Sequence, residues 1–323
     1  MKLSEVTPTI YFVGPTASGK SAAAMSTAMN TPGAEIICLD KATAWCGMDI
    51  GTAKPSSLDQ QQVPHQLVDV LHMDNIDYRP AGRRYLNDIF GTYPDNLTGI
   101  LCLEAQKHLA RLRSVGSAAI CVGGSGALYS SLYGGYTFPQ TEPRYDARLR
   151  ELSCIGARGM RAYLVARGIP LPFTPEDDRG NFDDAGVLFE QIVQAETQIR
   201  QNAGQQKAVV IGIDIDDKEL KERIEARTAD MLDRGLEDEV EYLVWRHAWR
   251  LPLRSTVGYK EFRGRVALEE RFISQGRVEE LINANTLQYA RRQRAWCRAR
   301  PEVRWVRNPE EATELALRAL DVR

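Results

Sequence analysis

A glycine-rich segment near the N-terminus has the spacing of a phosphate-binding loop. Residues 9–21 read TIYFVGPTASGKS, in which Gly14, Gly19, Lys20 and Ser21 follow the pattern Gly-x-x-x-x-Gly-Lys-Ser. The glycines let the backbone turn so that consecutive N–H groups face phosphate oxygens, and the helix expected next adds its positive end. The lysine offers a positive charge and the serine a hydroxyl suited to bound Mg2+. We therefore predict that this loop binds phosphate.

The chain offers no obvious acidic partner for hydrolysing a bound nucleotide. A nucleotide hydrolase needs a carboxylate at the end of a second strand to hold Mg2+ against the terminal phosphate. The strand predicted at Ala118–Val122 runs instead into Gly-Gly-Ser, and a weaker strand candidate, ILCLE, ends at Glu104. On these residues alone, an enzyme that holds a diphosphate without hydrolysing it is as well supported as a kinase.

Composition limits the class of protein but not its partner. The chain has 323 residues, of which 43% are hydrophobic, so it can bury a sizeable core. Its net charge of −2 favours no class of binding partner. Six scattered cysteines without Cys-x-x-Cys predict buried thiols in a reducing compartment. No apolar stretch approaches the ~18 residues of a membrane span, and no signal-peptide pattern is present. We expect a cytoplasmic protein with no membrane partner, and a monomer.

Short apolar runs, each followed by a turn signal and a helical pattern, predict the fold class. The expected strands are Ile10–Val13, Glu35–Leu39, Ala118–Val122 and Val209–Ile213. This alternation is typical of an α/β fold, a parallel sheet that contains the P-loop and is flanked by helices. We expect a core over 1–137, a helical insertion over 138–206, and a segment over 207–323 that completes the core and ends in helices. The long amphipathic stretch after Asp216, an expected N-cap, belongs to this last segment.

Longer motifs resemble the tRNA dimethylallyltransferase (isopentenyltransferase) family. In chain order they are Gly14–Ser21, Leu39-Asp40, Gly47–Pro55 (GMDIGTAKP), Val63–Val70 (VPHQLVDV), Val122–Tyr129 (VGGSGALY), Val257–Phe262 (VGYKEF) and Gln288–Trp296 (QYARRQRAW). The likeness spans most of residues 8–307. It implies transfer of a prenyl group from dimethylallyl diphosphate to the N6 amine of adenine, with Mg2+ as cofactor and tRNA as acceptor. The phosphate loop would then hold the leaving diphosphate.

The resemblance also implies roles for individual residues. Asp40 stands where the family has its general base, although an aspartate there could also cap a helix. Ser125 replaces the family's threonine and keeps a hydroxyl for the bridging oxygen, while Lys20 and Mg2+ at Ser21 neutralise charge. The residues expected to bind the diphosphate are Gly14, Thr16, Ala17, Ser18, Gly19, Lys20, Ser21 and Arg223, and those expected on the acceptor side are Lys41, Thr43, Trp45, Arg292 and Gln293.

Two arginine patterns have an alternative interpretation. Arg223 and Arg227 share one helix face, as they would on a face exposed only to solvent. Seven arginines fall between positions 291 and 307 and are a candidate polyanion contact. Within QYARRQRAW, we expect Tyr289, Gln293 and Trp296 to pack on the core. The opposite face, with Arg291, Arg294 and Arg298, is expected to meet phosphates, or only to keep the surface soluble.

Departures from the family pattern leave the acceptor open. After Asp40 the family usually continues Ser-x-Gln-x-Tyr, whereas this chain has Lys41-Ala42-Thr43-Ala44-Trp45. Acids at Asp183 and Asp184 stand where the insertion usually has arginines, Leu287 stands where an arginine is common, and residues 91–102 look like extra sequence. Transfer to a free adenine nucleotide, as in cytokinin-forming enzymes, or to another small amine therefore remains open. So do a P-loop kinase and a catalytically lapsed RNA-binding protein.

Overall fold

A computed structural model describes residues 8–78, 84–86, 93–94, 97–134, 158–167, 208–249, 252–266 and 273–321. The chain divides into two compact units. The first combines Met1–Asn75, Leu103–Gly126 and Gln206–Arg323, and the second combines Ile76–Cys102 and Ala127–Gln205. The domain boundaries expected from the sequence, 1–137, 138–206 and 207–323, stay a prediction.

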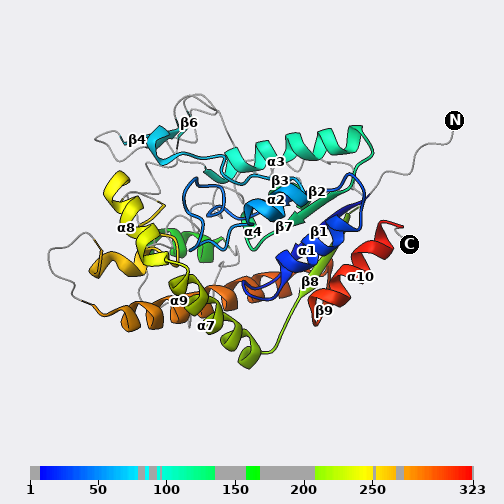
Figure 1. Cartoon of the computed structure of the whole chain (residues 1–323). Helices are drawn as coiled ribbons and strands as arrows, with labels where there is room; N and C mark the ends of the chain where they lie inside the picture. The colour runs from blue at the N-terminus through cyan, green and yellow to red at the C-terminus, as the bar shows by residue number, and fades with distance from the viewer. Residues whose placement is uncertain are drawn as a thin grey trace. The chain divides into compact units, whose positions relative to one another are not determined.

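The first unit contains a parallel six-stranded sheet, which confirms the α/β fold (Figure 1). The strand order is β3-β2-β7-β1-β8-β9. The strands are β1 (Thr9–Val13), β2 (Glu35–Cys38), β3 (His65–Gln66), β7 (Ala119–Val122), β8 (Ala208–Ile213) and β9 (Val303–Val306). The four expected strands are all present, and the two that the sequence did not suggest, β3 and β9, lie at the edges of the sheet.

The central strand β1 explains why the phosphate loop is rigidly held. All five of its residues are buried, as expected for a strand covered on both faces of a parallel sheet. Its neighbours are β7, with Phe12 opposite Val122, and β8, with Phe12 opposite Ile211. Because parallel strands end at the same edge, the loops after β1, β2 and β7 converge there. The Leu39 N–H donates to the Val122 carbonyl at 2.6 Å and joins two of these loops.

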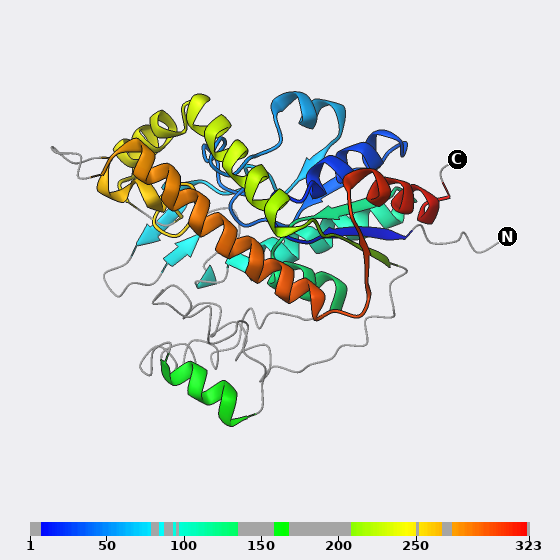
Figure 2. The same cartoon turned by 90° about the horizontal axis from the view of Figure 1, so that it is seen from below.

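Helices of the first unit run beside the sheet in pairs. Figure 1 shows α1 (Lys20–Met29) next to α10 (Pro309–Ala319), and the Thr313 hydroxyl of α10 reaches the Ala23 carbonyl of α1. Figure 2 shows α9 (Gln275–Arg298) running along α7 (Asp217–Asp233). The first unit also contains α2 (Ser57–Gln62), α8 (Leu236–His247), most of α3 (Leu97–Ser114) and two 3-10 turns, η1 (Met73–Asn75) and η4 (Lys260–Gly264).

One predicted N-cap is confirmed, and one predicted continuous helical stretch is divided. The Asp216 carboxylate accepts the N–H groups of Lys218 and Glu219 and caps α7. The amphipathic stretch after it breaks at Gly235, whose φ of 93° lies in the left-handed region that favours glycine. The pattern therefore forms two helices, α7 and α8.

The alternative strand ILCLE is wrong. These residues lie inside α3 (Leu97–Ser114), where Glu104 pairs with Lys107 at 2.6 Å. The run reads as a strand because it is short and apolar, and only the helical residues that follow it reveal the longer element. Glu104 therefore does not stand at the end of a strand, which is the position that a Mg2+ ligand of a nucleotide hydrolase requires.

The second unit contains a small sheet and a helix that precede the expected insertion, and one described helix of the insertion itself. A three-stranded antiparallel sheet pairs β4 (Ile76–Tyr78), β5 (Arg84–Leu86) and β6 (Tyr93–Pro94). Helix α4 (Gly126–Gly134) begins at the boundary, and a helix covers residues 158–166. The rest of the predicted insertion, with Asp183 and Asp184, lies outside the described residues.

Two further predictions concern the whole chain. In the part of the chain that the structure describes, no helix is both long and apolar enough to cross a bilayer. The five described cysteines, Cys38, Cys46, Cys102, Cys121 and Cys297, are free thiols, and all but Cys46 are buried.

Candidate functional site

The loop after β1 has the backbone geometry that phosphate binding requires. Gly14 has a φ of 129°, and a Cβ added there would lie 2.6 Å from the Ile213 carbonyl oxygen, so no other residue fits. Gly19 also has a positive φ, of 96°, and α1 begins directly after it at Lys20. The Lys20 ammonium donates back to the Pro15 carbonyl and closes the loop on itself. The positive end of α1 and this ammonium thus face the same turn.

Lys20 is poised to lose or regain its charge near neutral pH. Burial lowers the pKa of Lys20 from 10.5 to about 8. The positive charge of Arg227 acts in the same direction, whereas Asp40 and an ionised Cys297 would raise it. Burial raises the pKa of Cys297 to about 11, so at neutral pH that residue is an uncharged thiol. Asp40 is thus the negative group whose charge favours the protonated form of Lys20.

Thr16 is held from two sides. Its N–H donates to Gln293 Oε1 of α9 at 2.7 Å, and its hydroxyl accepts a hydrogen bond from the guanidinium group of Arg227 of α7 at 3.1 Å. Arg223, the arginine expected to bind the diphosphate, instead forms an ion pair with Glu219 at 2.6 Å on the surface of α7. The four-residue spacing had identified both arginines, and the structure brings Arg227 to the loop.

Asp40 and Ser125 come together at the carboxyl ends of β2 and β7. The Ser125 N–H donates to the Leu39 carbonyl at 3.3 Å, next to Asp40. The Asp40 carboxylate accepts the Ala42 N–H at 2.8 Å and caps a turn, not the helix that was the alternative interpretation. Its charge also helps to raise the pKa of the Tyr289 hydroxyl, an effect that burial dominates. A carboxylate, a phosphate loop and a serine loop therefore converge at one edge of the sheet.

The residues after Asp40 are mostly packed inward. The Thr43 hydroxyl donates to the Asp40 carbonyl at 3.1 Å, and Trp45 is 5% exposed and bridges to Leu71. Lys41 is half-buried. Among the acceptor-side predictions on α9, the Arg292 guanidinium lies 6.0 Å from the Tyr289 ring centre, and Gln293 is 7% exposed.

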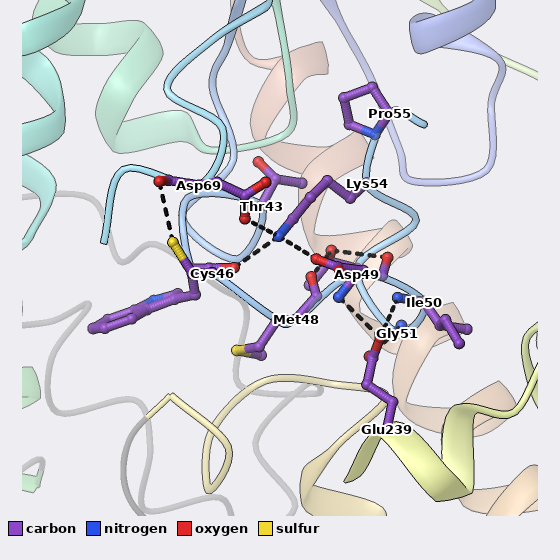
Figure 3. Close-up of polar contacts among 12 residues, drawn as sticks. Thr43, Cys46, Met48, Asp49, Ile50, Gly51, Lys54, Pro55, Asp69 and Glu239 are labelled. Atoms are coloured by element: carbon purple, nitrogen blue, oxygen red, sulfur yellow. Dashed lines mark hydrogen bonds and ion pairs between the residues drawn. The ribbon is translucent and has the colours of Figure 1, made fainter. Parts of the chain in front are cut away.

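Sequence reasoning identified the GMDIGTAKP motif but not what its lysine does. Figure 3 shows Lys54 among residues of neighbouring loop segments. Its ammonium donates to the Trp45 carbonyl at 2.8 Å and forms ion pairs with Asp49 at 2.6 Å and Asp69 at 2.5 Å. The Lys54 side chain is only 4% exposed, so breaking these contacts would leave a buried charge unpaired. Lys54 therefore joins GMDIGTAKP to VPHQLVDV and to the acceptor-side run.

Glu239 of α8 holds the same loop from below, and no motif had indicated it. Its carboxylate accepts the N–H groups of Asp49, Ile50 and Gly51 at 2.8–3.2 Å (Figure 3). It also accepts the Tyr259 hydroxyl at 2.5 Å, which connects the loop to the VGYKEF motif. Charge-assisted bonds of this kind are the stronger ones in proteins, so they hold the backbone of residues 49–51 in one conformation.

The expectation that one face of α9 meets phosphates is wrong for its central arginine. Arg294 is 11% exposed, contacts Asp214 at 2.8 Å and also pairs with Asp217. Arg298 pairs with Asp214 at 2.6 Å, and Arg291 with Asp217 at 3.7 Å. The sequence could not show this because the two aspartates lie some eighty residues earlier. This face instead ties α9 to the β8–α7 junction.

The residues present fit Mg2+ only in company with a bound phosphate. Mg2+ takes oxygen ligands and is usually held by one or two protein oxygens together with substrate phosphates. Ser21 is an exposed residue on the first turn of α1, and its side chain carries the hydroxyl that such a site would use. The described residues contain no cluster of three or more metal-ligating side chains. Ser18 is fully buried with no hydrogen-bond partner for its hydroxyl among them, as expected where a ligand supplies the missing bond.

A family model and similar known proteins point to the same family. The family model described as IPP transferase matches residues 43–89 and 101–300. A protein named tRNA dimethylallyltransferase from Trichormus variabilis is 30% identical over 306 residues, covering 93% of this chain and 94% of its own. One of the same name from Picosynechococcus is 30% identical over 323 residues, covering 98% of each chain.

Solved structures share the fold. A tRNA isopentenylpyrophosphate transferase from Bacillus halodurans superposes with a TM-score of 0.62 at 20% identity, over 98% of this chain and 97% of its own. A tRNA isopentenylpyrophosphate transferase from Staphylococcus epidermidis gives 0.61 at 24% identity, over 96% and 98%. At these identities the likeness establishes the architecture of the chain.

Proposed function

Because the chain belongs to the IPP transferase family and is therefore a prenyl-transferring enzyme, we propose that it moves a dimethylallyl group from dimethylallyl diphosphate to the N6 amine of an adenine in tRNA. The single observation that carries this proposal is geometric: Asp40 follows β2, the Ser125 N–H donates to the adjacent Leu39 carbonyl, and the loop Gly14–Ser21 leaves β1 at the same edge of the sheet. A carboxylate beside a phosphate loop suits a reaction in which a proton leaves one substrate while a diphosphate leaves the other.

The reaction balances with the groups at this edge of the sheet. The N6 lone pair forms a bond to the first carbon of the allyl group, and the bond from that carbon to oxygen breaks. The electron pair of the broken bond leaves with the diphosphate, and the proton of N6 passes to Asp40. An exocyclic amine is a weak nucleophile, and a positioned base typically contributes about 10²–10⁴-fold to such a step.

The leaving diphosphate is neutralised by groups from three parts of the chain. Lys20 gives up its bond to Pro15 and turns to the phosphates, while Arg227 approaches from α7 through its contact with Thr16. The Ser125 hydroxyl donates to the bridging oxygen from the β7–α4 loop. Ser21 would hold Mg2+ together with the phosphates, and the ion supplies positive charge where negative charge develops.

Hydrolysis of a nucleotide is disfavoured by the strands on either side of β1. β7 ends in Gly-Gly-Ser, and β8 ends before Asp214, whose carboxylate is occupied by Arg294 and Arg298. A kinase or ATPase would use an acid at such a strand end to hold Mg2+. Asp40 lies one strand further out, after β2.

The acceptor is the part of this proposal with a specific competitor. Matching relatives that carry the name tRNA dimethylallyltransferase cover nearly the whole chain and support tRNA. The residue after the proposed base is Lys41, where the family resemblance predicts a serine, and a lysine there would attract the phosphate of a free nucleotide such as AMP. Transfer to a free adenine nucleotide is therefore the second candidate.

The test is transfer of labelled dimethylallyl to three acceptors in separate reactions: unmodified tRNA, AMP and ATP. We expect label in tRNA, and its loss in Lys20→Met, which removes the loop charge but keeps the side-chain volume. Label in AMP or ATP with none in tRNA would show that the acceptor is a free nucleotide, while the proposed prenyl transfer would stand. Phosphate release from ATP that depends on Lys20, without transfer to any acceptor, would reject prenyl transfer.

A further inference from the structure

Gln293 uses both ends of its carboxamide on the backbone of two separate loops. Its oxygen accepts the Thr16 N–H of the phosphate loop at 2.7 Å, and its nitrogen donates to the Gly124 carbonyl of the β7–α4 loop at 3.2 Å. The residue is 7% exposed, so water cannot easily replace either bond. A side chain bonded to both loops in this way fixes the distance between them.

The β7–α4 loop is shaped to fit against α9. A Cβ added at Gly124 would lie 1.8 Å from Gln293 Nε2, and one added at Gly126 would lie 2.5 Å from the Trp296 ring. Both glycines are therefore required by the close approach of the helix. Ser125 lies between them, so contacts with α9 on either side fix its position.

We propose that Gln293 is a positioning residue that holds the phosphate loop and Ser125 at the separation of the two ends of a bound diphosphate. The inference rests on the proposed function, because it assumes that Thr16 and Ser125 contact one ligand. It gives Gln293 a different role from the acceptor contact expected from the sequence: both polar ends of its amide are already bonded within the chain.

A ligand that spans both loops should depend on this spacing more than a ligand held by one loop. Inorganic pyrophosphate would contact both, whereas inorganic phosphate needs only the N–H groups and Lys20 of the phosphate loop. Gln293→Asn is neutral but one methylene shorter, so it cannot reach Thr16 and Gly124 together. General loosening of the fold would weaken both ligands equally and would lower the melting temperature.

The experiment measures the dissociation constants of pyrophosphate and phosphate for the full chain by calorimetry. In Gln293→Asn we expect the constant for pyrophosphate to rise about 10-fold, roughly the effect of one lost hydrogen bond, and that for phosphate to stay within about twofold. Gln275→Asn, the same change at an exposed position of α9, should change neither. Equal changes for the two ligands, or none for pyrophosphate, would overturn the positioning role.

A second variant disturbs the same contact from the other side. Gly124→Ala would push the Gln293 amide away and should reproduce the selective loss of pyrophosphate. The double variant Gly124→Ala with Gln293→Asn should be no worse than the weaker-binding single variant, because one contact is lost only once. Additive losses would overturn the proposal.

The two proposals can fail separately. Suppose that Gln293→Asn weakens the binding of pyrophosphate but not that of phosphate, while the wild-type protein transfers no prenyl group. This result would support the positioning role and reject the proposed function. Prenyl transfer to tRNA with unchanged pyrophosphate binding in Gln293→Asn would reject only the positioning role. A wild-type chain that binds no pyrophosphate would overturn both.

Discussion

Asp40 is the residue on which the proposed chemistry depends most. It stands at the end of β2, where its charge acts on Lys20 and Arg227. We expect Asp40→Asn to reduce turnover at saturating substrates by about 10²-fold or more, because an amide cannot take a proton at neutral pH. Pyrophosphate should bind no more weakly, since the change removes a negative charge and can keep the bond to the Ala42 N–H.

The matched control for this prediction is Asp233→Asn, an exposed position near the end of α7. It should leave both turnover and pyrophosphate binding unchanged. Full turnover in Asp40→Asn would assign the proton to another group and remove the role proposed for this carboxylate.

From the lowered pKa of Lys20 we expect diphosphate binding to depend on pH. Burial lowers the pKa of Lys20 to about 8, so below that pH the ammonium is charged and attracts the ligand. As pH rises through 8 the free protein loses this charge, and the affinity for pyrophosphate should fall by up to about tenfold per pH unit. Calorimetry between pH 7 and pH 9.5 measures this fall.

Pyrophosphate itself gains negative charge over the same range, so a reference variant is needed. In Lys20→Arg the guanidinium stays charged throughout, and affinity relative to pH 7 should not fall. Parallel pH profiles for wild type and Lys20→Arg would show that Lys20 does not titrate where burial places it.

At the scale of elements, α9 is held by its arginines to the β8–α7 junction. Arg294→Met should destabilise the chain by about 3 kcal/mol, because it leaves the half-buried Asp214 with a weakened set of partners. Urea unfolding measures this loss. Arg304→Met, on an exposed position of β9, should cost less than about 0.5 kcal/mol.

The same variants separate a structural role of these arginines from RNA binding. Each phosphate contact that is lost should reduce the salt dependence of tRNA affinity by about one unit of slope. We expect no change of slope in Arg294→Met. A reduced slope without loss of stability would restore the phosphate-binding interpretation of this α9 face.

The sequence was sufficient where local pattern decides the structure. All four predicted strands are buried apolar runs followed by turns, and the Asp216 cap depends on residues two and three positions away. It was insufficient where distant residues decide. The partners of Arg294 are far along the chain, and the edge strands β3 and β9 are short runs that form only by pairing with the central sheet.

The candidate site divides in the same way. The loop residues and Asp40 are identified by motif, and they do lie at one edge of the sheet. Arg227 could not be separated from Arg223 by spacing, because only the direction of α7 decides which one reaches Thr16. Glu239 was not identified, since its bonds are to backbone N–H groups, which carry no residue type.

At the scale of the whole molecule, the open choice is the acceptor. Lys41 and Thr43 follow the proposed base, where the family resemblance predicts serine and glutamine. Lys41→Ser with Thr43→Gln should raise the ratio of tRNA to AMP prenylation, since a site that hydrogen-bonds its acceptor rejects one that leaves its groups unpaired. Competition between the two acceptors in one reaction measures the ratio. An unchanged ratio would show that this run does not select the acceptor.

The central claim is that the loop at Gly14–Ser21 holds a diphosphate that leaves as an adenine of tRNA is alkylated. The most direct measurement is to count pyrophosphate released and N6-dimethylallyl adenosine formed in one reaction of the purified chain with dimethylallyl diphosphate and unmodified tRNA. We predict one pyrophosphate for each modified adenosine, with both products absent in Lys20→Met. Pyrophosphate released without modified adenosine, or modified adenosine formed at the full rate in Lys20→Met, would contradict the claim.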